Sequence, residues 1–479
     1  MCSNLVGGKP VNKKMLSITP LFILMGSVAL AGTVYFGTVQ ALTEVTGIIS
    51  SDVTWTTANS PYTLTGNVLV QNGVTLTIQP DVTINLGDYY ILVNGTLVAK
   101  GITSSPIRFN GGSITFSGFS VGWNEQTGSG CLVENAFFSS TSISSDSSVK
   151  ISKSSLNAGI SGGGSTIISE NIIEGEVSGG LVSGNTITGE VSGVTVSNNI
   201  ITGRVSGNVI SKNTITGGIV ARGNCIIYEN TITGGIEGTG NGILVASEYV
   251  IGGGYPTIED NLIANTDIGI NIGVLIRDWF SANIPQIQRN LITKNSVGVK
   301  FTISEQNPYG DREPTTIQEN TISQNAIGIK IDGSFWHCTI QNNNIQDSSD
   351  YNLCLEGTSN SVDVTYNWWG TNSEQAISQS IYDFEDDFNL GSVDFVPFLT
   401  EPNPEAPEAS DVPTTTPTPT SMPSLSPSPT TSPEQEPSPT PSQGPMLTPE
   451  QFEVILGVAI TVVVFGAGLG LLIYLIKRK

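Results

Sequence analysis

Residues 183–217 read SGNTITGEVSGVTVSNNIITGRVSGNVISKNTITG, a stretch that repeats one short unit. The motif Asn-x-Ile returns every fourteen residues, at Asn185, Asn199 and Asn213. Short runs in which apolar and polar residues alternate are typical of β-strands, and a fixed period is typical of stacked repeats. The stretch therefore predicts successive turns of a solenoid.

The same motif continues toward the C-terminus with a longer period. The unit Ile-x-x-Asn-x-Ile recurs five times between Ile227 and Ile345, and a second strand-like segment follows it, as in AIGIKI at 326. Asn320 and Asn343 are 23 residues apart, which at ~3.3 Å per residue suits one turn of a three-sided coil. Related shifts earlier in the chain, such as Leu76 to Leu97, extend this prediction toward the N-terminus.

We expect the repeated asparagines to stack at one corner, where each side-chain amide bonds to the next turn. A buried amide without a partner costs ~1 to 3 kcal/mol, so stacking explains why the residue repeats. The expected ladder is Asn171, Asn185, Asn199, Asn213, Asn230, Asn261, Asn290, Asn320, Asn343 and Asn367. Between Asn171 and Asn213 each 14-residue repeat forms either one narrow turn or half of a 28-residue turn. The sequence leaves both alternatives open.

Composition excludes several classes of function. A net charge of −22 with only 19 Lys plus Arg opposes binding to nucleic acid phosphates. Five Cys without a CxxC pair and a single His leave no ligand set for zinc or copper. We therefore expect buried free thiols and no cofactor.

The two ends predict membrane attachment. Residues 1–41 contain Lys13 and Lys14 before an apolar run, which indicates a signal peptide or an N-terminal anchor. Residues 452–476 are expected to span a bilayer, because Val454 to Ile476 is an apolar run of sufficient length, and the basic tail 477–479 follows it. Residues 401–449 are rich in Pro, Thr, Ser and Glu, a composition typical of a disordered, extended stalk.

Two stretches resemble the right-handed parallel β-helix proteins, a group that includes pectate lyase-like folds and periplasmic β-helix repeats. YTLTGNVLVQNGVTLTIQPDVTINL from Tyr62 is similar to their opening turns, and YNWWGTNSEQAISQSIYDFEDDF from Tyr366 is similar to their closing segment. The resemblance implies an all-β, right-handed parallel β-helix over 53–370 with a C-terminal cap over 371–400. It carries no activity by itself, because this coil hosts lyases, hydrolases, adhesins and structural proteins.

The expected cap has three features. Trp368 and Trp369 are predicted to plug the apolar column, and residues 373–382 are predicted to form a short helix. Four acidic residues offer oxygen ligands to calcium, but their spacing lacks a fixed ligand loop and favours a solvated acidic surface. These residues are Asp383, Glu385, Asp386 and Asp387.

Across one corner, corresponding apolar positions are 11 residues apart from Ile329 to Ile340. The same spacing is 15, 17 and 18 residues after Ile243, Ile270 and Val299, so three consecutive turns carry insertions there. Insertions on one face of a solenoid usually build its binding surface. The expected ligand-binding side chains are Tyr249, Tyr255, Trp279, Phe280, Tyr309, Trp336 and His337. These aromatic side chains can stack on sugar rings or simply pack the loops onto the coil.

Arg277, Asp278, Asp311 and Arg312 lie in the same insertions and are the weak catalytic candidates. Two carboxylates held ~5 to 9 Å apart would suit glycoside cleavage. Asn265-Thr266-Asp267 is similar to a fragment of a polygalacturonase motif, but the rest of that motif is absent, so a turn is the expected role.

We therefore predict a membrane-anchored extracellular β-helix that recognises carbohydrate or another surface, in adhesion or in the envelope of a prokaryote, archaea included. The alternatives are a polysaccharide lyase or glycoside hydrolase acting on acidic polysaccharide, and a purely structural envelope spacer. The predicted partners are the membrane and a polysaccharide or glycosylated surface, without nucleic acid.

Overall fold

The computed structural model describes residues 42–246, 254–275, 285–304, 315–333 and 338–408. The chain divides into two compact units, 1–419 and 420–479, and every described residue belongs to the first. Both apolar end segments, 1–41 and 452–476, lie outside the described residues. Within the described part, no helix has the length and apolarity that a bilayer crossing requires.

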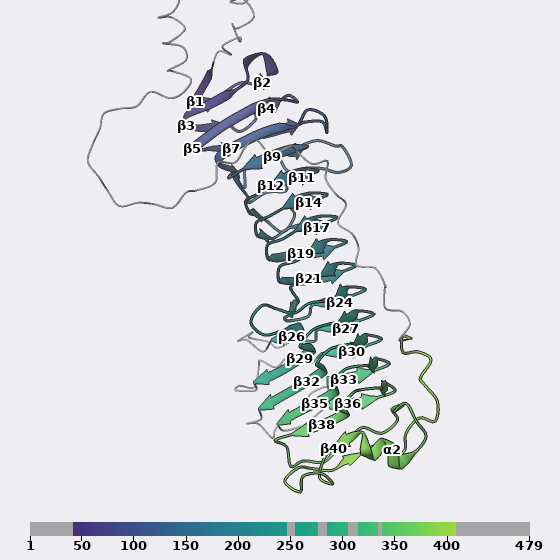
Figure 1. Cartoon of the computed structure of the whole chain (residues 1–479). Helices are drawn as coiled ribbons and strands as arrows, with labels where there is room; N and C mark the ends of the chain where they lie inside the picture. Colours follow the sequence, from purple (N-terminus) through teal and green to yellow (C-terminus); the bar gives the residue numbers. More distant parts are fainter. Residues whose placement is uncertain (1–41, 247–253, 276–284, 305–314, 334–337, 409–479) are drawn as a thin grey trace, which may run out of the picture. The chain divides into compact units, whose positions relative to one another are not determined.

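In the described part, thirty-nine strands form one continuous sheet that coils into a solenoid with three faces, here called A, B and C. Every pairing between named strands is parallel, so each turn of the chain lies directly on the previous one, from β1 at one end to β40 at the other (Figure 1). The all-β, parallel architecture expected from the repeats is confirmed.

Face A contains β2 (Val53–Trp55), β4 (Thr75–Ile78), β6 (Thr96–Lys100), β8 (Leu132–Glu134), β11 (Lys150–Ser152), β14 (Ile167–Ser169), β17 (Leu181–Ser183), the second halves of β19 (Val191–Ser197) and β21 (Val205–Ser211), β24 (Ile226–Tyr228), β27 (Thr257–Glu259), β30 (Gln286–Gln288), β33 (Thr315–Gln318) and β36 (Cys338–Gln341).

Face B contains the first halves of β1 (Thr43–Ile49), β3 (Tyr62–Val70), β5 (Thr83–Val93) and β7 (Ile107–Phe116), then β9 (Ala136–Ser139), β12 (Ser155–Leu156), β15 (Ile172–Ile173), β18 (Thr186–Ile187), β20 (Ile200–Ile201), β22 (Thr214–Ile215), β25 (Thr231–Ile232), β28 (Leu262–Ala264), β31 (Leu291–Thr293), β34 (Thr321–Ser323) and β37 (Asn344–Gln346).

Face C contains the second halves of β1, β3, β5 and β7, then β10 (Ser142–Ser145), β13 (Ile160–Gly162), β16 (Val177–Ser178), the first halves of β19 and β21, β23 (Ile219–Ala221), β26 (Asn241–Ala246), β29 (Ile268–Leu275), β32 (Val297–Ser304), β35 (Ile327–Gly333), β38 (Tyr351–Glu356) and β40 (Ile381–Tyr382).

The core is a column of inward-pointing Ile and Val side chains from all three faces. On face A, for example, Ile258, Ile287, Ile317 and Ile340 pair in register and are fully buried. Burying one such side chain contributes ~1.5 to 3 kcal/mol. Because each side chain packs against the turns above and below it, the turns stabilise one another.

The expected asparagine ladder occupies the corner between faces A and B, and all ten side chains are buried. Asn290 shows the repeating pattern of bonds. Its Nδ2 donates to the Ile258 carbonyl at 2.8 Å and to the Asn320 Oδ1 at 3.0 Å. Its Oδ1 accepts from the backbone N–H and the Nδ2 of Asn261. The amides from Asn171 to Asn343 therefore bond to both neighbouring turns, and Asn367 ends the ladder.

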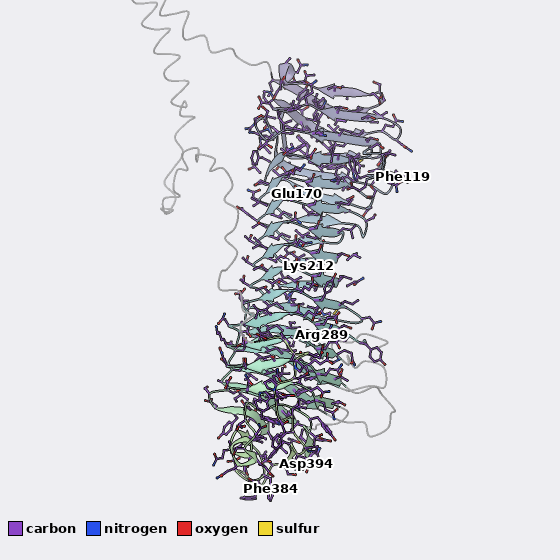
Figure 2. The ribbon with its side chains drawn as sticks, turned by 90° about the vertical axis from the view of Figure 1, so that its right-hand side faces the viewer. Phe119, Glu170, Lys212, Arg289, Phe384 and Asp394 are labelled. Atoms are coloured by element: carbon purple, nitrogen blue, oxygen red, sulfur yellow. The ribbon has the colours of Figure 1, made fainter. Side chains whose placement is uncertain are left out.

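The residue before each ladder asparagine turns the chain through the left-handed region of backbone space. Glu170, Lys212 and Arg289 have φ values of 58°, 58° and 52°, and they follow one line along the solenoid in Figure 2. Only Gly184 among these ten positions is glycine. Left-handed backbone costs an ordinary residue roughly 1 to 2 kcal/mol, so the amide bonds must offset that cost at nearly every turn.

The 14-residue repeats form one narrow turn each, because Val182 pairs with Val196 and Val196 pairs with Ile210. The half-turn alternative is therefore wrong. Close stacking of backbone makes this neck possible at the corner between faces B and C. A Cβ at Gly203 would lie 2.1 Å from the carbonyl oxygen of Gly189, so only glycine fits there.

The C-terminal end is closed by the segment after β38. Trp369 is buried and packs edge-on against Phe395, in agreement with its predicted place at the end of the apolar column. The helix α2 spans only Glu374–Gln379, with Ser373 as its N-cap. We expected helix as far as Tyr382, but Ile381 and Tyr382 form β40, because they continue face C by pairing with β38. β39 (Val362–Asp363) pairs with β41 (Val393–Asp394) beneath this cap.

The ordered solenoid is longer than the expected 53–370. At the N-terminal end it begins with β1, and the short 3-10 helix η1 (Thr57–Asn59) follows β2. Beyond the cap, residues 401–408, expected in the stalk, lie against face B. There the Asn403 N–H donates to the Asn344 Oδ1 at 2.8 Å, and the Thr321 hydroxyl donates to the Pro407 carbonyl.

Replacing a central ladder residue should be severe. Asn290→Ala removes two donors and an acceptor among buried groups, so we expect the free energy of unfolding to fall by about 3 to 5 kcal/mol. Asn67→Ala, at an exposed position with one long hydrogen bond of 3.3 Å, is the control and should cost less than ~1 kcal/mol. Denaturant unfolding followed by circular dichroism measures both, and equal losses would contradict the ladder's role.

Gly203→Ala tests the packing of the neck. The added methyl group must displace backbone of the preceding turn, so we expect destabilisation of about 1 to 3 kcal/mol. Gly118→Ala is the matched control, because no atom lies within 4 Å of the position that its Cβ would take. Thermal melting of both variants, compared with the parent chain, checks this, and a melt unchanged by Gly203→Ala would exclude the tight stacking.

Candidate functional site

The insertions all leave the corner between faces C and A. The strands before them, β26, β29, β32 and β35, are paired in sequence, and so are the strands after them, β27, β30, β33 and β36. The loops from four consecutive turns therefore start and end side by side. This arrangement matches the common corner expected from the sequence spacing.

Most of the expected ligand-binding and catalytic side chains lie outside the described residues. They are Tyr249, Arg277, Asp278, Trp279, Phe280, Tyr309, Asp311, Arg312, Trp336 and His337. Tyr255 is described: its side chain is exposed, and its backbone N–H donates to the Asn224 Oδ1 at 2.9 Å. The described part of this region is the outer surface of face C, on the strands that lead into the loops.

Register places one outward row along that surface. Leu244, Asn271, Lys300, Lys330 and Cys354 pair successively, and Tyr382 follows Cys354. These are the positions between two inward apolar residues in segments such as IGIKI. Parallel pairing in register brings them together, although they are 24 to 30 residues apart in sequence.

Two lysines in this row form ion pairs across turns. The Lys300 Nζ lies 3.6 Å from Asp332 Oδ2, and the Lys330 Nζ lies 2.7 Å from Glu356 Oε2. Both lysine side chains are about three-quarters buried, with exposures of 25% and 21%. Face C therefore carries two largely buried cations, each beside a carboxylate, on the strands from which the loops leave.

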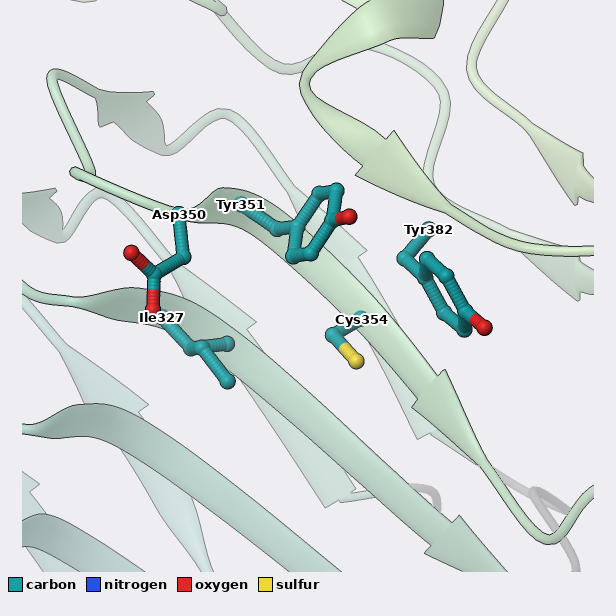
Figure 3. Close-up of a pocket in the computed structure, with 5 residues that line it drawn as sticks. All are labelled: Ile327, Asp350, Tyr351, Cys354 and Tyr382. Atoms are coloured by element: carbon teal, nitrogen blue, oxygen red, sulfur yellow. The ribbon is translucent and has the colours of Figure 1, made fainter. Parts of the chain in front are cut away.

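A hollow of about 470 Å³ ends the row (Figure 3). Its lining residues are Ile327, Asp350, Tyr351, Cys354 and Tyr382. The rings of Tyr351 and Tyr382 lie 5.2 Å apart at an angle of 55°. Aromatic faces beside hydroxyl and carboxylate groups are the chemistry that sugar-binding sites use.

Burial raises the pKa of the Cys354 thiol above its ordinary value, and the nearby Lys330 partly opposes this shift. The pKa of Tyr382 is also raised, by desolvation and by the carboxylates of Asp387 and Asp386. Both groups are therefore neutral at physiological pH. The Tyr382 hydroxyl can donate and accept hydrogen bonds, while the Cys354 thiol is a weak donor and not a nucleophile.

The described residues hold no group of three or more His, Cys, Asp or Glu side chains that could bind a metal ion. The carboxylate of Asp383, one of the calcium candidates, accepts backbone N–H groups from Glu385 at 3.0 Å and from Val393 at 2.8 Å. Its oxygens thus hold a turn of the cap.

Sequence reasoning did not identify the lysine row, the tyrosine pair or a second ladder. Thr266, Asn295 and Asn325 stack at the corner between faces B and C, where Asn295 Oδ1 accepts from the Thr266 hydroxyl at 2.8 Å and Asn325 Oδ1 accepts from Asn295 Nδ2 at 3.1 Å. Thr266 therefore has a structural role. The signal was available, because these residues recur at intervals of 29 and 30.

No protein-family model, curated protein or solved structure matches the chain.

The reactivity of the cysteine thiols tests how the core and the surface of face C are packed. Because burial raises the pKa of Cys131 and Cys225 and both side chains are inaccessible, we expect iodoacetamide at mildly alkaline pH to label neither until the chain unfolds. Cys354, half-buried in the hollow, should react before Cys131 and Cys225, and its rate should keep rising above the usual pKa of a free thiol. Peptide mass mapping, with Cys354→Ser as control, checks this; prior labelling of Cys225 would contradict the packing.

Proposed function

We propose that the chain is a right-handed parallel β-helix tethered to a prokaryotic membrane, and that face C with its adjoining loops binds carbohydrate on a cell or envelope surface. The signal or anchor over 1–41, the stalk over 401–449 and the membrane segment over 452–476 belong to the same proposal. The resemblance of the repeats to pectate lyase-like coils supports the handedness.

One observation carries the proposed binding role. Lys300, Lys330 and Tyr382 lie in one row on the strands that lead into the loops, and Tyr351 packs against Tyr382 at the end of that row. Lysine ammonium groups can bind carboxylate or hydroxyl oxygens, while tyrosine rings offer flat apolar faces to sugar rings. A ligand that supplies its own carboxylates can replace Asp332 and Glu356 as partners of the lysines, which favours an acidic polysaccharide.

Three outcomes separate the candidate functions. Full-length chain is incubated with a panel of acidic and neutral polysaccharides, and both retention and chain shortening are scored. Retention without shortening supports recognition. Release of products that stops with Asp278→Asn identifies a lyase or hydrolase, and neither retention nor shortening identifies a structural spacer.

Variants locate the binding surface. Lys300→Ala with Lys330→Ala should weaken retention of acidic polysaccharide about tenfold or more, because two charge-assisted contacts are lost. Lys212→Ala is the matched control: this exposed lysine also forms an ion pair, 3.3 Å from Glu229, but at the corner between faces A and B. Trp279→Ala should weaken binding if the loops contribute. Equal loss in the control would assign retention to general charge and reject face C.

A further inference from the structure

The turn between β40 and β41 exposes two phenylalanine side chains. Phe384 is 53% exposed and Phe388 is 79% exposed. Figure 2 shows Phe384 at the C-terminal end of the solenoid. In the same cap, Leu390, Phe395 and Phe398 pack against the core. The cap thus buries some of its large apolar residues and leaves these two in solvent.

The turn is held by its own hydrogen bonds. The Asp383 carbonyl accepts the N–H groups of Asp386 and Asp387 at 3.0 and 2.9 Å, and the Phe384 N–H donates to the Gly391 carbonyl at 3.0 Å. The carboxylate of Asp383 ties the start of the turn to β41 through Val393. Both phenylalanines therefore sit on a preorganised backbone, which lowers the entropy cost of binding.

The charge around the turn is of one sign. From Cys338 to Glu408 the sequence has thirteen Asp or Glu and no Lys, Arg or His. Glu385, Asp386 and Asp387 lie between the two phenylalanines, and hydrogen bonds from Asn389 lower the pKa of Asp387, which keeps it ionised. An apolar surface with an acidic rim is complementary to a partner surface that is apolar at its centre and basic at its rim.

This pattern argues against a lipid surface. Anionic headgroups repel a cluster of carboxylates, and the interfacial residues that favour membranes are Trp, Tyr and basic side chains. Exposed apolar residues rimmed by polar groups instead mark sites of contact with other proteins.

We propose that the Phe384–Phe388 turn is a docking site for a protein segment that presents aliphatic side chains together with lysine or arginine. The phenylalanines would enter an apolar surface of that partner while the carboxylates pair with its cations. This surface lies at the end of the solenoid and is distinct in chemistry from the lysine row of face C, so the inference does not require the proposed carbohydrate binding.

The test uses full-length chain and a synthetic amphipathic peptide of leucine and lysine as the probe. We expect binding that weakens as salt is raised. Phe384→Ser with Phe388→Ser should weaken it at least about tenfold, as loss of central aromatic anchors does. Phe119→Ser is the matched control, because Phe119 is also 73% exposed but follows β7, far from the cap in sequence, and should leave binding unchanged.

Two further variants address the rim. Asp386→Asn and Asp387→Asn keep the acceptor oxygens that the turn uses but remove charge, so binding should weaken about threefold or more and lose part of its salt dependence. Circular dichroism confirms that each variant keeps the parent's strand signal.

Three results would overturn the proposal. They are equal binding by the double phenylalanine variant, an equal loss with Phe119→Ser, and phenylalanine-dependent binding to phosphatidylcholine vesicles that is as tight as binding to the peptide. The last result would assign the turn to a lipid surface.

Discussion

The amide ladder between faces A and B is the constraint on which the structure depends. Each ladder asparagine before Asn367 bonds to the turn before it and the turn after it, and the residue ahead of it is held in left-handed backbone. A corner that satisfies buried amides in both directions must keep the same geometry at every turn. Changes in turn length must therefore occur elsewhere.

That constraint explains how the solenoid changes width without breaking. Ladder neighbours are 14 residues apart from Asn185 to Asn199, 31 apart from Asn230 to Asn261, and 23 apart from Asn320 to Asn343. Face C absorbs much of this difference, growing from two residues in β16 to eight in β29. The wide strands give the chain an outer surface large enough for the lysine row and the tyrosine pair.

Parallel register also distributes charge along the solenoid. Ion pairs between turns, such as Lys212 with Glu229 and Arg289 with Asp260, occur where both signs are present. Beyond Lys330 the described residues carry carboxylates alone, so the C-terminal end differs in chemistry from the rest. Exposed pairs of this kind contribute little to stability, so the arrangement bears on what each surface can bind.

The sequence by itself determined the coil, because Asn-x-Ile at a fixed period and Ile or Val at alternate positions satisfy one corner and one core. It also determined the common corner of the insertions, since ladder spacing and strand spacing can be counted. Only the tertiary structure decided the width of the neck, because one repeat per turn and two repeats per turn bury the same residues. The backbone contact between Gly189 and Gly203 shows that each turn contains one repeat. The tertiary structure also placed Lys330 beside Glu356 and Tyr351 beside Tyr382. Strand pairing between turns brings together residues that are far apart in the sequence. The register of that pairing depends on the geometry of every preceding corner.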